Sequence, residues 1–290
     1  MWLLLLHKTP SKFLKTNWFI SNPFVKTLVY ANVFIALCAL AQVFLTYHLF
    51  PIPVNFENNS YLLFILLSTY LQYNVQRGYM IGPHNINSER SQWLLKRKKT
   101  LLYSIVISLI TVMFLCNTLS WTSIGVMVGA EIISTLYYIQ PFNLRRHGYI
   151  KPFLISFVWV ISCSLVPLIE NQLLTSHSVW YLVSQVLFIS VLCFLFDIKD
   201  IKHDYDSGVN TYANKFGEKA TKIMCICSAA LAFFCFYQFR HDVGSLIGSI
   251  ILRTLVILTI LFTNQKRHHF YYYLWVDGLM LIQAILFFVF

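Results

Sequence analysis

Long apolar runs alternate with short polar segments along almost the whole chain. A membrane-spanning helix needs about 20 mostly apolar residues. Nine segments meet this requirement, near residues 25–47, 60–76, 101–118, 121–140, 152–169, 179–196, 220–239, 243–263 and 270–290. No linker or low-complexity segment separates them. The pattern therefore predicts an all-α fold, a polytopic membrane bundle of nine transmembrane helices that forms one domain over residues 25–290.

Composition supports a membrane protein and excludes several other classes. Hydrophobic residues make up 58% of the chain and charged residues 11%, whereas a soluble domain has about 25% charged residues. A soluble enzyme, a disordered chain and a disulfide scaffold are thereby excluded. The net charge of +11 does not indicate nucleic acid, because the cations lie in short clusters between apolar runs and not on one solvated face. Membrane lipid is the expected partner, and nothing indicates an oligomeric state.

The distribution of Lys and Arg predicts how the chain is oriented. Residues 1–24 combine Lys8, Lys12 and Lys15 with Phe and Trp, which is typical of a cytoplasmic arm at the membrane surface. Twenty of the 22 Lys and Arg residues lie near this arm or in the loops after the second, fourth, sixth and eighth predicted helices. An excess of these residues marks the cytoplasmic side. We therefore expect an integral multi-pass membrane protein with its N-terminus in the cytoplasm and its C-terminus outside. In a bacterium, this membrane would be the inner membrane.

Acidic residues gather directly after the sixth predicted helix. Residues 196–208 contain four of the chain's eleven acidic residues, which are Asp197, Asp200, Asp204 and Asp206. If the helix continues, the first three share one face and Asp206 points away. Carboxylates on one face repel one another unless a cation lies among them, and Mg²⁺ takes carboxylate oxygens together with substrate phosphate oxygens. The segment predicts either a Mg²⁺ site for a diphosphate or a solvated cap neutralised by Lys199 and Lys202.

This segment resembles the second aspartate motif of the UbiA superfamily of membrane prenyltransferases. It reads Asp-Ile-Lys-Asp-x-x-x-Asp from Asp197 and leads to Gly208, Thr211 and Gly217. The exit of the fourth predicted helix is similar to the family pattern of Tyr, Pro and Leu-Arg, where Tyr137 or Tyr138 takes the place of the family tyrosine. The resemblance implies a UbiA-like fold. It also implies that the carboxylates at 197, 200 and 204 are catalytic Mg²⁺ ligands.

The first aspartate motif of the family is broken in this chain. The family carries an Asn-Asp-x-x-Asp-x-x-x-Asp pattern at the end of its second helix, which completes the metal site. The corresponding stretch, residues 73–82, keeps Asn74 but contains no carboxylate, and it brings in Arg77. A guanidinium can bind diphosphate oxygens with two N–H groups. Either Arg77 replaces one Mg²⁺, or the machinery for ionising the diphosphate is lost.

The resemblance implies an intramembrane prenyltransferase, which binds an isoprenyl diphosphate through Mg²⁺ and transfers the prenyl group to an aromatic or lipid acceptor. The candidate substrate-binding residues are Asn74, Arg77, Tyr137, Arg145, Lys151, Lys199 and Lys202. A cyclase-like outcome without a second substrate is open within the same superfamily. The alternatives from other classes are a non-catalytic membrane protein that binds an isoprenoid or lipid, and a transporter.

Three charged residues fall inside predicted spans, namely Glu131, Arg253 and Asp277. An unpaired charge within the bilayer costs at least a few kcal/mol, so each should face protein. Glu131 and Arg253 lie at similar depth when the rise per residue is counted from the cytoplasmic ends. We expect these two to form an ion pair that joins helices, with Asp277 as the competing partner; a substrate or proton path is the alternative.

Overall fold

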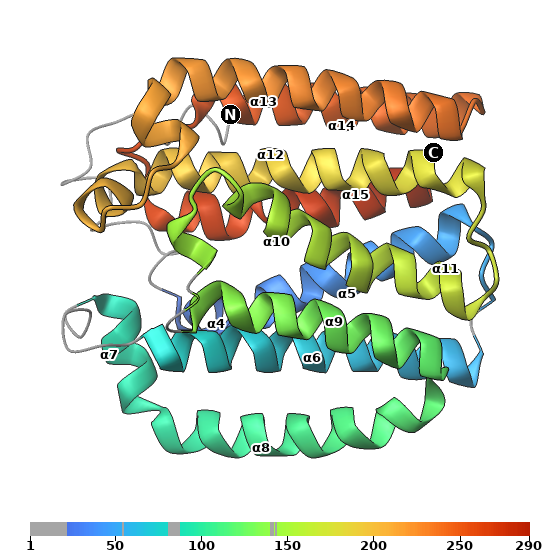
Figure 1. Ribbon diagram of the computed structural model, residues 1–290, viewed down its shortest axis with the longest axis horizontal. Helices are drawn as coiled ribbons and strands as arrows, with labels where there is room; N and C mark the ends of the chain where they lie inside the picture. Colours follow the sequence, from blue (N-terminus) through green and yellow to red (C-terminus); the bar gives the residue numbers. More distant parts are fainter. Residues whose placement is uncertain (1–21, 54, 81–87, 140–141, 143) are drawn as a thin grey trace.

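The computed structural model describes residues 22–53, 55–80, 88–139, 142 and 144–290, without the side chains of residues 56–58, 79, 80 and 145. Its long helices run side by side (Figure 1). The first half comprises α4 (Pro23–Tyr30), α5 (Val33–Leu49), α6 (Phe56–Met80), α7 (Glu89–Lys96), α8 (Lys98–Leu115) and α9 (Trp121–Tyr138). The second half comprises α10 (Lys151–Val160), α11 (Val166–Glu170), α12 (Ser176–Asp206), α13 (Tyr212–Phe239), α14 (Val243–Phe262) and α15 (Gly278–Val289). The shorter elements are η3 (Cys116–Thr118), η4 (Leu144–Arg146), and the π-helical η5 (Ile161–Leu165) and η6 (Tyr271–Val276).

Each of the nine predicted segments is mainly helical in the described part of the chain, so the all-α prediction is confirmed. Six helices are long and apolar enough to cross a membrane, and the bent pair α4–α5 makes a seventh if it is one span. The other two predicted spans are α6 and α9. Both line cavities with polar side chains, such as Gln76 and Glu131, which lower their hydropathy. Nine crossings are therefore not confirmed.

The predicted span 25–47 is broken between α4 and α5, which meet at 66°. Asn32 sits at the break with a left-handed φ of 60°, a conformation that Asn tolerates better than most residues. The amide of Asn32 donates to Asn74 Oδ1 on α6 at 3.1 Å, and Asn74 donates back to the carbonyl oxygen of Ala31 at 3.0 Å. These two amides fix the break against α6.

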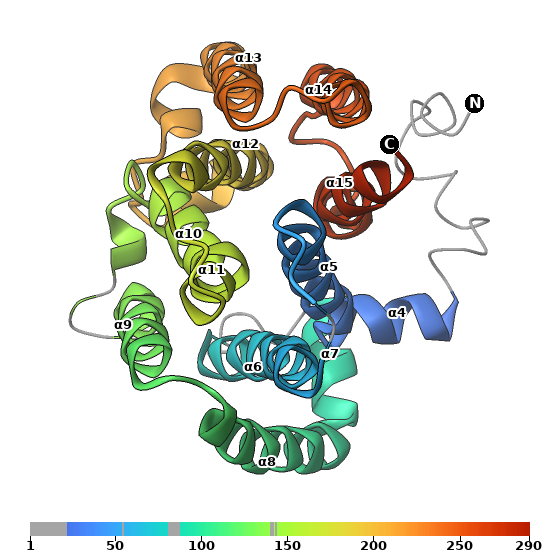
Figure 2. The ribbon, with the colours of Figure 1, turned by 90° about the vertical axis from the view of Figure 1, so that its right-hand side faces the viewer.

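The helices follow one another around a ring. Successive neighbours are α8, α6, α5, α15, α14, α13, α12, α10 and α9, and Figure 2 shows this order along the helix axes. The side of α8 that faces away from the ring carries large apolar residues in exposed positions, among them Ile107, Ile110 and Phe114. Such a face is expected to contact lipid, because an apolar helix surface in water would be costly.

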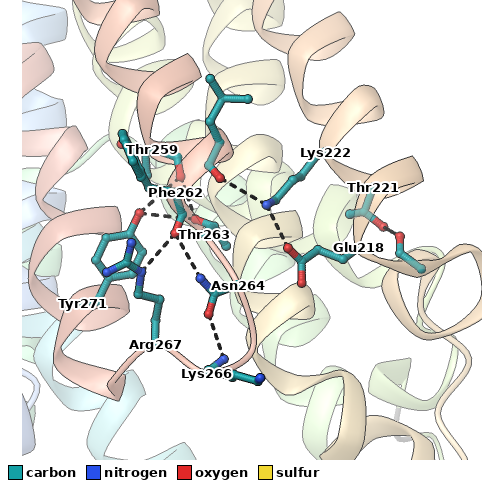
Figure 3. Close-up of polar contacts among 12 residues, drawn as sticks. Glu218, Thr221, Lys222, Thr259, Phe262, Thr263, Asn264, Lys266, Arg267 and Tyr271 are labelled. Atoms are coloured by element: carbon teal, nitrogen blue, oxygen red, sulfur yellow. Dashed lines mark hydrogen bonds and ion pairs between the residues drawn. The ribbon is translucent and has the colours of Figure 1, made fainter. Parts of the chain in front are cut away.

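The turn after α14 fixes the start of the last span (Figure 3). Arg267 Nε donates to the carbonyl oxygen of Phe262 at 3.0 Å, which caps the end of α14. Lys222 on α13 lies 2.8 Å from Glu218 Oε1 and donates to the carbonyl oxygen of Leu261 at 3.2 Å. These contacts hold α13 and α14 together at the end of the bundle where η6 begins.

Candidate functional site

A cavity of about 700 Å³ lies between α5, α6, α7, α10, α12 and η6. Its charged lining residues are Arg77, Glu89, Arg90, Lys151, Lys199, Asp200 and Asp277. All of these except Asp277 come from the ends of helices at the α7 end of the bundle (Figure 1). Further along the bundle the wall is mostly apolar and aromatic, with Trp159 on α10, Leu192 on α12 and Met280 on α15. The cavity therefore has a charged end and an apolar end.

The helix α12 continues to Asp206. The acidic segment is therefore helical, which is the condition for its first three carboxylates to share one face. Asp197 and Asp204 are seven residues apart, so they point in directions only about 20° apart, whereas Asp200 is rotated by about 60° from Asp197. The first two are fully buried and away from the cavity, and Asp200 lines it. Asp206 is exposed. Helical geometry thus divides the motif into two buried carboxylates and one that faces the cavity.

Lys151 at the start of α10 joins the two buried carboxylates. Its Nζ lies 2.6 Å from Asp197 Oδ1 and 3.4 Å from Asp204 Oδ2. Asp197 Oδ2 and Asp204 Oδ1 have no hydrogen-bond partner within the described structure, although His203 Nδ1 lies 3.6 Å from the latter. This ion-paired group holds α10 against α12, and Lys151 still reaches the cavity wall.

The glycines and threonine of the second motif shape the return from α12 into α13. Gly208 adopts a left-handed φ of 69° directly after the helix, a conformation that glycine adopts without strain. Thr211 then caps α13 by accepting from the backbone N–H of Asn214. A Cβ on Gly148 would lie 2.4 Å from the carbonyl oxygen of Asn210, so this glycine lets the loop before α10 approach the turn.

The two candidates from the first motif have separate positions. Asn74 is buried and holds the α4–α5 break, away from the cavity. Arg77 lines the cavity, and it makes no hydrogen bond or ion pair with any residue that the structure describes. Of the two, only Arg77 is in a position to meet a ligand.

Sequence reasoning missed Arg90, which enters the cavity from α7. Its Nη2 donates to Asn32 Oδ1 at 2.5 Å, and its guanidinium lies 5.3 Å from the ring centre of Tyr273. Burial, together with the charge of Arg77, lowers the pKa of Arg90 to about 10, so it remains charged at neutral pH. The sequence feature that could have pointed to Arg90 is Ser88, because this residue is the N-cap of α7 and so places Arg90 in the first turn of a helix. From the sequence alone, the basic residues of this loop indicate only the orientation of the chain.

The structure places three more of the candidate residues on the cavity wall, namely Tyr137, Lys151 and Lys199. Lys199 lies 3.2 Å from Asp200 Oδ1 and 5.0 Å from the ring centre of Tyr273. Lys202 is exposed and away from the cavity. The side chain of Arg145 lies outside the described part of the structure.

Mg²⁺ takes oxygen ligands, and the carboxylates of the acidic segment are the candidates for it. Within the described residues, no three His, Cys, Asp or Glu side chains are arranged to hold a metal ion. Asp197 and Asp204 hold Lys151, so Asp200 is the one motif carboxylate on the cavity. Mg²⁺ is commonly bound by one or two carboxylates and completes its shell with water and substrate phosphate oxygens. The residues therefore fit one ion at Asp200 together with a bound phosphate group.

The predicted ion pair between Glu131 and Arg253 is wrong. Their helices, α9 and α14, lie on opposite sides of the bundle (Figure 2). Glu131 lines a smaller cavity of about 240 Å³. Arg253 is buried 3.5 Å from Ser184 Oγ and above the ring of Phe188. Asp277, the competing partner, lines the large cavity instead. Depth along the membrane normal says nothing about which helices are neighbours.

Comparison with curated proteins finds no match. A solved structure described as digeranylgeranylglyceryl phosphate synthase in membranes is similar over 92% of this chain and 97% of that chain, with a TM-score of 0.59 and 15% sequence identity. At this identity the likeness shows the fold. The UbiA prenyltransferase family matches residues 92–285, which is more than half of the chain and includes the whole acidic segment. The chain, a multi-pass membrane protein with this helical fold, belongs to the UbiA prenyltransferase family.

Proposed function

We propose that this prenyltransferase binds an isoprenyl diphosphate with the diphosphate at the charged end of the large cavity and the hydrocarbon tail along the apolar wall. The observation that carries the proposal is a pair of arginines on one cavity. Arg77 and Arg90 both line it, and neither has a carboxylate partner among the described residues. Two guanidiniums that repel each other across a cavity favour an anionic ligand between them.

Diphosphate suits these groups because guanidinium N–H groups bind phosphate oxygens in pairs. Lys151 and Lys199 add two ammonium groups on the same wall. Asp197 and Asp204 fix Lys151 in position, so they act on the substrate through this lysine. We assign the four cations to binding the diphosphate.

The remaining wall fits a prenyl chain. A volume of about 700 Å³ is within the usual range for small-ligand sites. Burying hydrocarbon contributes about 0.8 kcal/mol per CH₂ group. Tyr73, Tyr137 and Trp159 also line the cavity, and aromatic rings can stabilise a developing allylic cation.

Breaking the bond between the allylic carbon and the diphosphate leaves an electron pair on the diphosphate oxygen. Stabilising this charge is the main electrostatic task of the site. Arg77, Arg90 and Lys151 supply fixed positive charge for it. We propose Asp200 as the protein ligand of one Mg²⁺, which when bound adds further positive charge to the leaving group. An aromatic or lipid acceptor would then receive the prenyl group.

We also propose that the charged end faces the cytoplasm. This end carries α7, the acidic segment and the turn after α14 (Figure 1), and it contains most of the Lys and Arg residues. The positive-inside rule then places the diphosphate site at the cytoplasmic surface.

To test the proposal, purified wild-type protein is incubated with labelled geranyl, farnesyl and geranylgeranyl diphosphates, with and without Mg²⁺. Binding and release of diphosphate are measured separately. Binding followed by Mg²⁺-stimulated release supports the transferase. Binding without release with every donor would instead favour the non-catalytic isoprenoid-binding protein, which the missing carboxylates at residues 73–82 suggest. No binding of any donor would contradict the proposal.

A further inference from the structure

We propose that a small monovalent anion of the size of chloride binds inside the helix bundle beside Arg253, at a site separate from the large cavity. Arg253 lies in the middle of α14, and only 7% of its surface is exposed. It does not line the large cavity, whose cations come from other helices. The inference is therefore independent of the proposed function.

No carboxylate of the chain neutralises Arg253. The chain has eleven Asp and Glu residues, and the structure describes the side chains of all except Glu57. None of the described carboxylates pairs with Arg253 or is near enough to act on its guanidinium electrostatically. Glu57 lies at the start of α6, across the ring from α14 (Figure 2). The counter-charge for this buried cation must come from outside the chain.

The guanidinium of Arg253 also has unused hydrogen-bond donors. Its Nε and Nη1 have no partner among the described residues. Its Nη2 makes only a long contact of 3.5 Å with Ser184 Oγ, and that hydroxyl donates its own proton to the carbonyl oxygen of Ala232 at 2.8 Å. The ring of Phe188, 5.6 Å from the guanidinium carbon, offsets part of the cost of burial. A guanidinium keeps its charge in proteins, so a ligand is still required.

Neighbouring side chains leave further donors unpaired. Ser249, one turn before Arg253 on the same face of α14, has a buried hydroxyl without a partner in the described structure. Gln283 on α15 donates to Gln185 Oε1 on α12 at 3.4 Å, which leaves one N–H₂ group and one amide oxygen of the pair unbonded. Exchanging the nitrogen and oxygen of both amides would leave the same groups. Unpaired donors therefore outnumber unpaired acceptors.

The packing of the helices brings these groups to one level of the bundle. Gly248 on α14 lies against Leu286 on α15. Because the two helices run in opposite directions, Arg253 comes close to the level of Gln283. On α12 the adjacent residues Ser184 and Gln185 contact Arg253 and Gln283, respectively. Figure 2 shows α12, α14 and α15 on the same side of the ring.

A single small anion satisfies both requirements of this site. It supplies the one negative charge that the guanidinium lacks, and it accepts charge-assisted hydrogen bonds from N–H and O–H groups. Water would accept the same hydrogen bonds, but it would leave the buried charge uncompensated. A divalent anion would add a second charge for which the site has no cation. Bound chloride would hold α14 against α12 and α15.

The experiment measures retention of radiolabelled chloride by the purified protein in detergent, by equilibrium dialysis in gluconate buffer. The wild type should retain one chloride per chain more than Arg253→Gln, which removes the charge and keeps an amide. Arg146→Gln makes the same change at an exposed arginine and should equal the wild type. Chloride bound by the cations of the large cavity would appear in every variant, so it cancels in the comparison.

Two further variants make the test independent of how well Arg253→Gln folds. Ser249→Ala keeps the charge and removes one donor, so its chloride affinity should fall at least about fivefold. Replacing gluconate by chloride at equal ionic strength should raise the unfolding temperature of the wild type, because a ligand of the folded state stabilises it. Arg253→Met should lose this response.

Equal chloride retention by the wild type and Arg253→Gln would overturn the inference, and it would mean that water alone fills the site. If Arg253→Gln does not fold, unchanged chloride affinity in Ser249→Ala overturns it. Binding of isoprenyl diphosphate is measured on the same samples. A wild type that binds the diphosphate but retains no chloride at Arg253 refutes the inference alone, and the reverse result refutes the proposed function alone.

Discussion

At the scale of single residues, the charges of the site form two groups. Lys151, Asp197 and Asp204 are buried together and neutralise one another in part. Arg77 and Arg90 have no carboxylate partner in the described structure and line the cavity. The first group determines how α10 is placed and fixes Lys151 at the cavity wall, whereas the second has no such structural role and is available to a ligand. Substitutions in the two groups should therefore have different effects.

Lys151→Met should destabilise the protein strongly. It leaves two buried carboxylates without their cation, and breaking a buried ion pair in this way costs about 3–5 kcal/mol. Thermal unfolding in detergent measures the loss. Lys222→Met is the control, because its pair with Glu218 is partly exposed and its hydrogen bond to Leu261 is exposed, and an exposed ion pair is worth about 1 kcal/mol or less. Equal shifts for the two variants would contradict a structural role of Lys151.

Asp200→Asn should leave the fold intact and weaken Mg²⁺-dependent diphosphate binding at least tenfold, or about 1.4 kcal/mol. Asp200 lines the cavity and is partly exposed, so its amide should be tolerated. Calorimetric titration with and without Mg²⁺ gives the affinity. Asp206→Asn should bind like the wild type. Mg²⁺-dependent binding that survives Asp200→Asn would remove this carboxylate from the metal site.

At the scale of elements, α7 and the turn after α14 close the charged end of the cavity. Lys26 on α4 bonds Glu89 on α7 at 2.6 Å and lowers the pKa of Glu89. His269, between α14 and η6, lies 3.3 Å from the hydroxyl of Tyr30. Burial, together with the neighbouring His268, lowers the pKa of His269 to about 4. Helices from three parts of the chain thus meet through titratable groups.

The pKa of His269 predicts a stability that depends on pH. An unfolded histidine has a pKa of about 6.5, so below that pH the unfolded chain binds more protons than the folded one. Stability should be complete above about pH 6.5 and should fall as the pH drops toward 4. Thermal unfolding measured between pH 7 and pH 5 tests this dependence. His269→Gln should flatten the profile, and an unchanged slope would contradict the assignment.

The sequence predicted the helices well, because apolar runs and loop charges are local signals. It could not predict the break at Asn32, where no proline or glycine stands and a left-handed asparagine is held by α6. Nor could it place Lys151 between Asp197 and Asp204, which lie 46 and 53 residues further along the chain. Helical spacing showed which carboxylates share a face. Which helix lies opposite that face is a tertiary property.

At the scale of the whole molecule, the ring of helices separates two surfaces. Its interior holds a cavity with a charged end, and its exterior presents exposed apolar residues, most clearly on α8. The acidic segment and the chain's last residue lie at opposite ends of the bundle (Figure 1). Under the proposed function, membrane orientation therefore decides from which side the diphosphate enters.

Reporter fusions should place residue 205 in the cytoplasm and residue 290 outside. The reason is the concentration of Lys and Arg in the loops at the end of the bundle that contains residue 205. Protease protection in sealed vesicles gives an independent readout. Both positions on the same side would contradict the bundle as well as the orientation, since α12 and α15 end at opposite ends of it.

The central claim is that fixed arginines bind the diphosphate where carboxylates of the first motif are missing. The most direct measurement is the affinity for geranylgeranyl diphosphate, without Mg²⁺, in the wild type, Arg77→Lys, Arg77→Ala and the exposed control Arg146→Ala. We expect the wild type and Arg146→Ala to bind equally, and Arg77→Lys to bind more weakly because the paired N–H groups are lost. Arg77→Ala should bind at least about tenfold more weakly than the wild type. Unchanged affinity in Arg77→Ala would contradict the account.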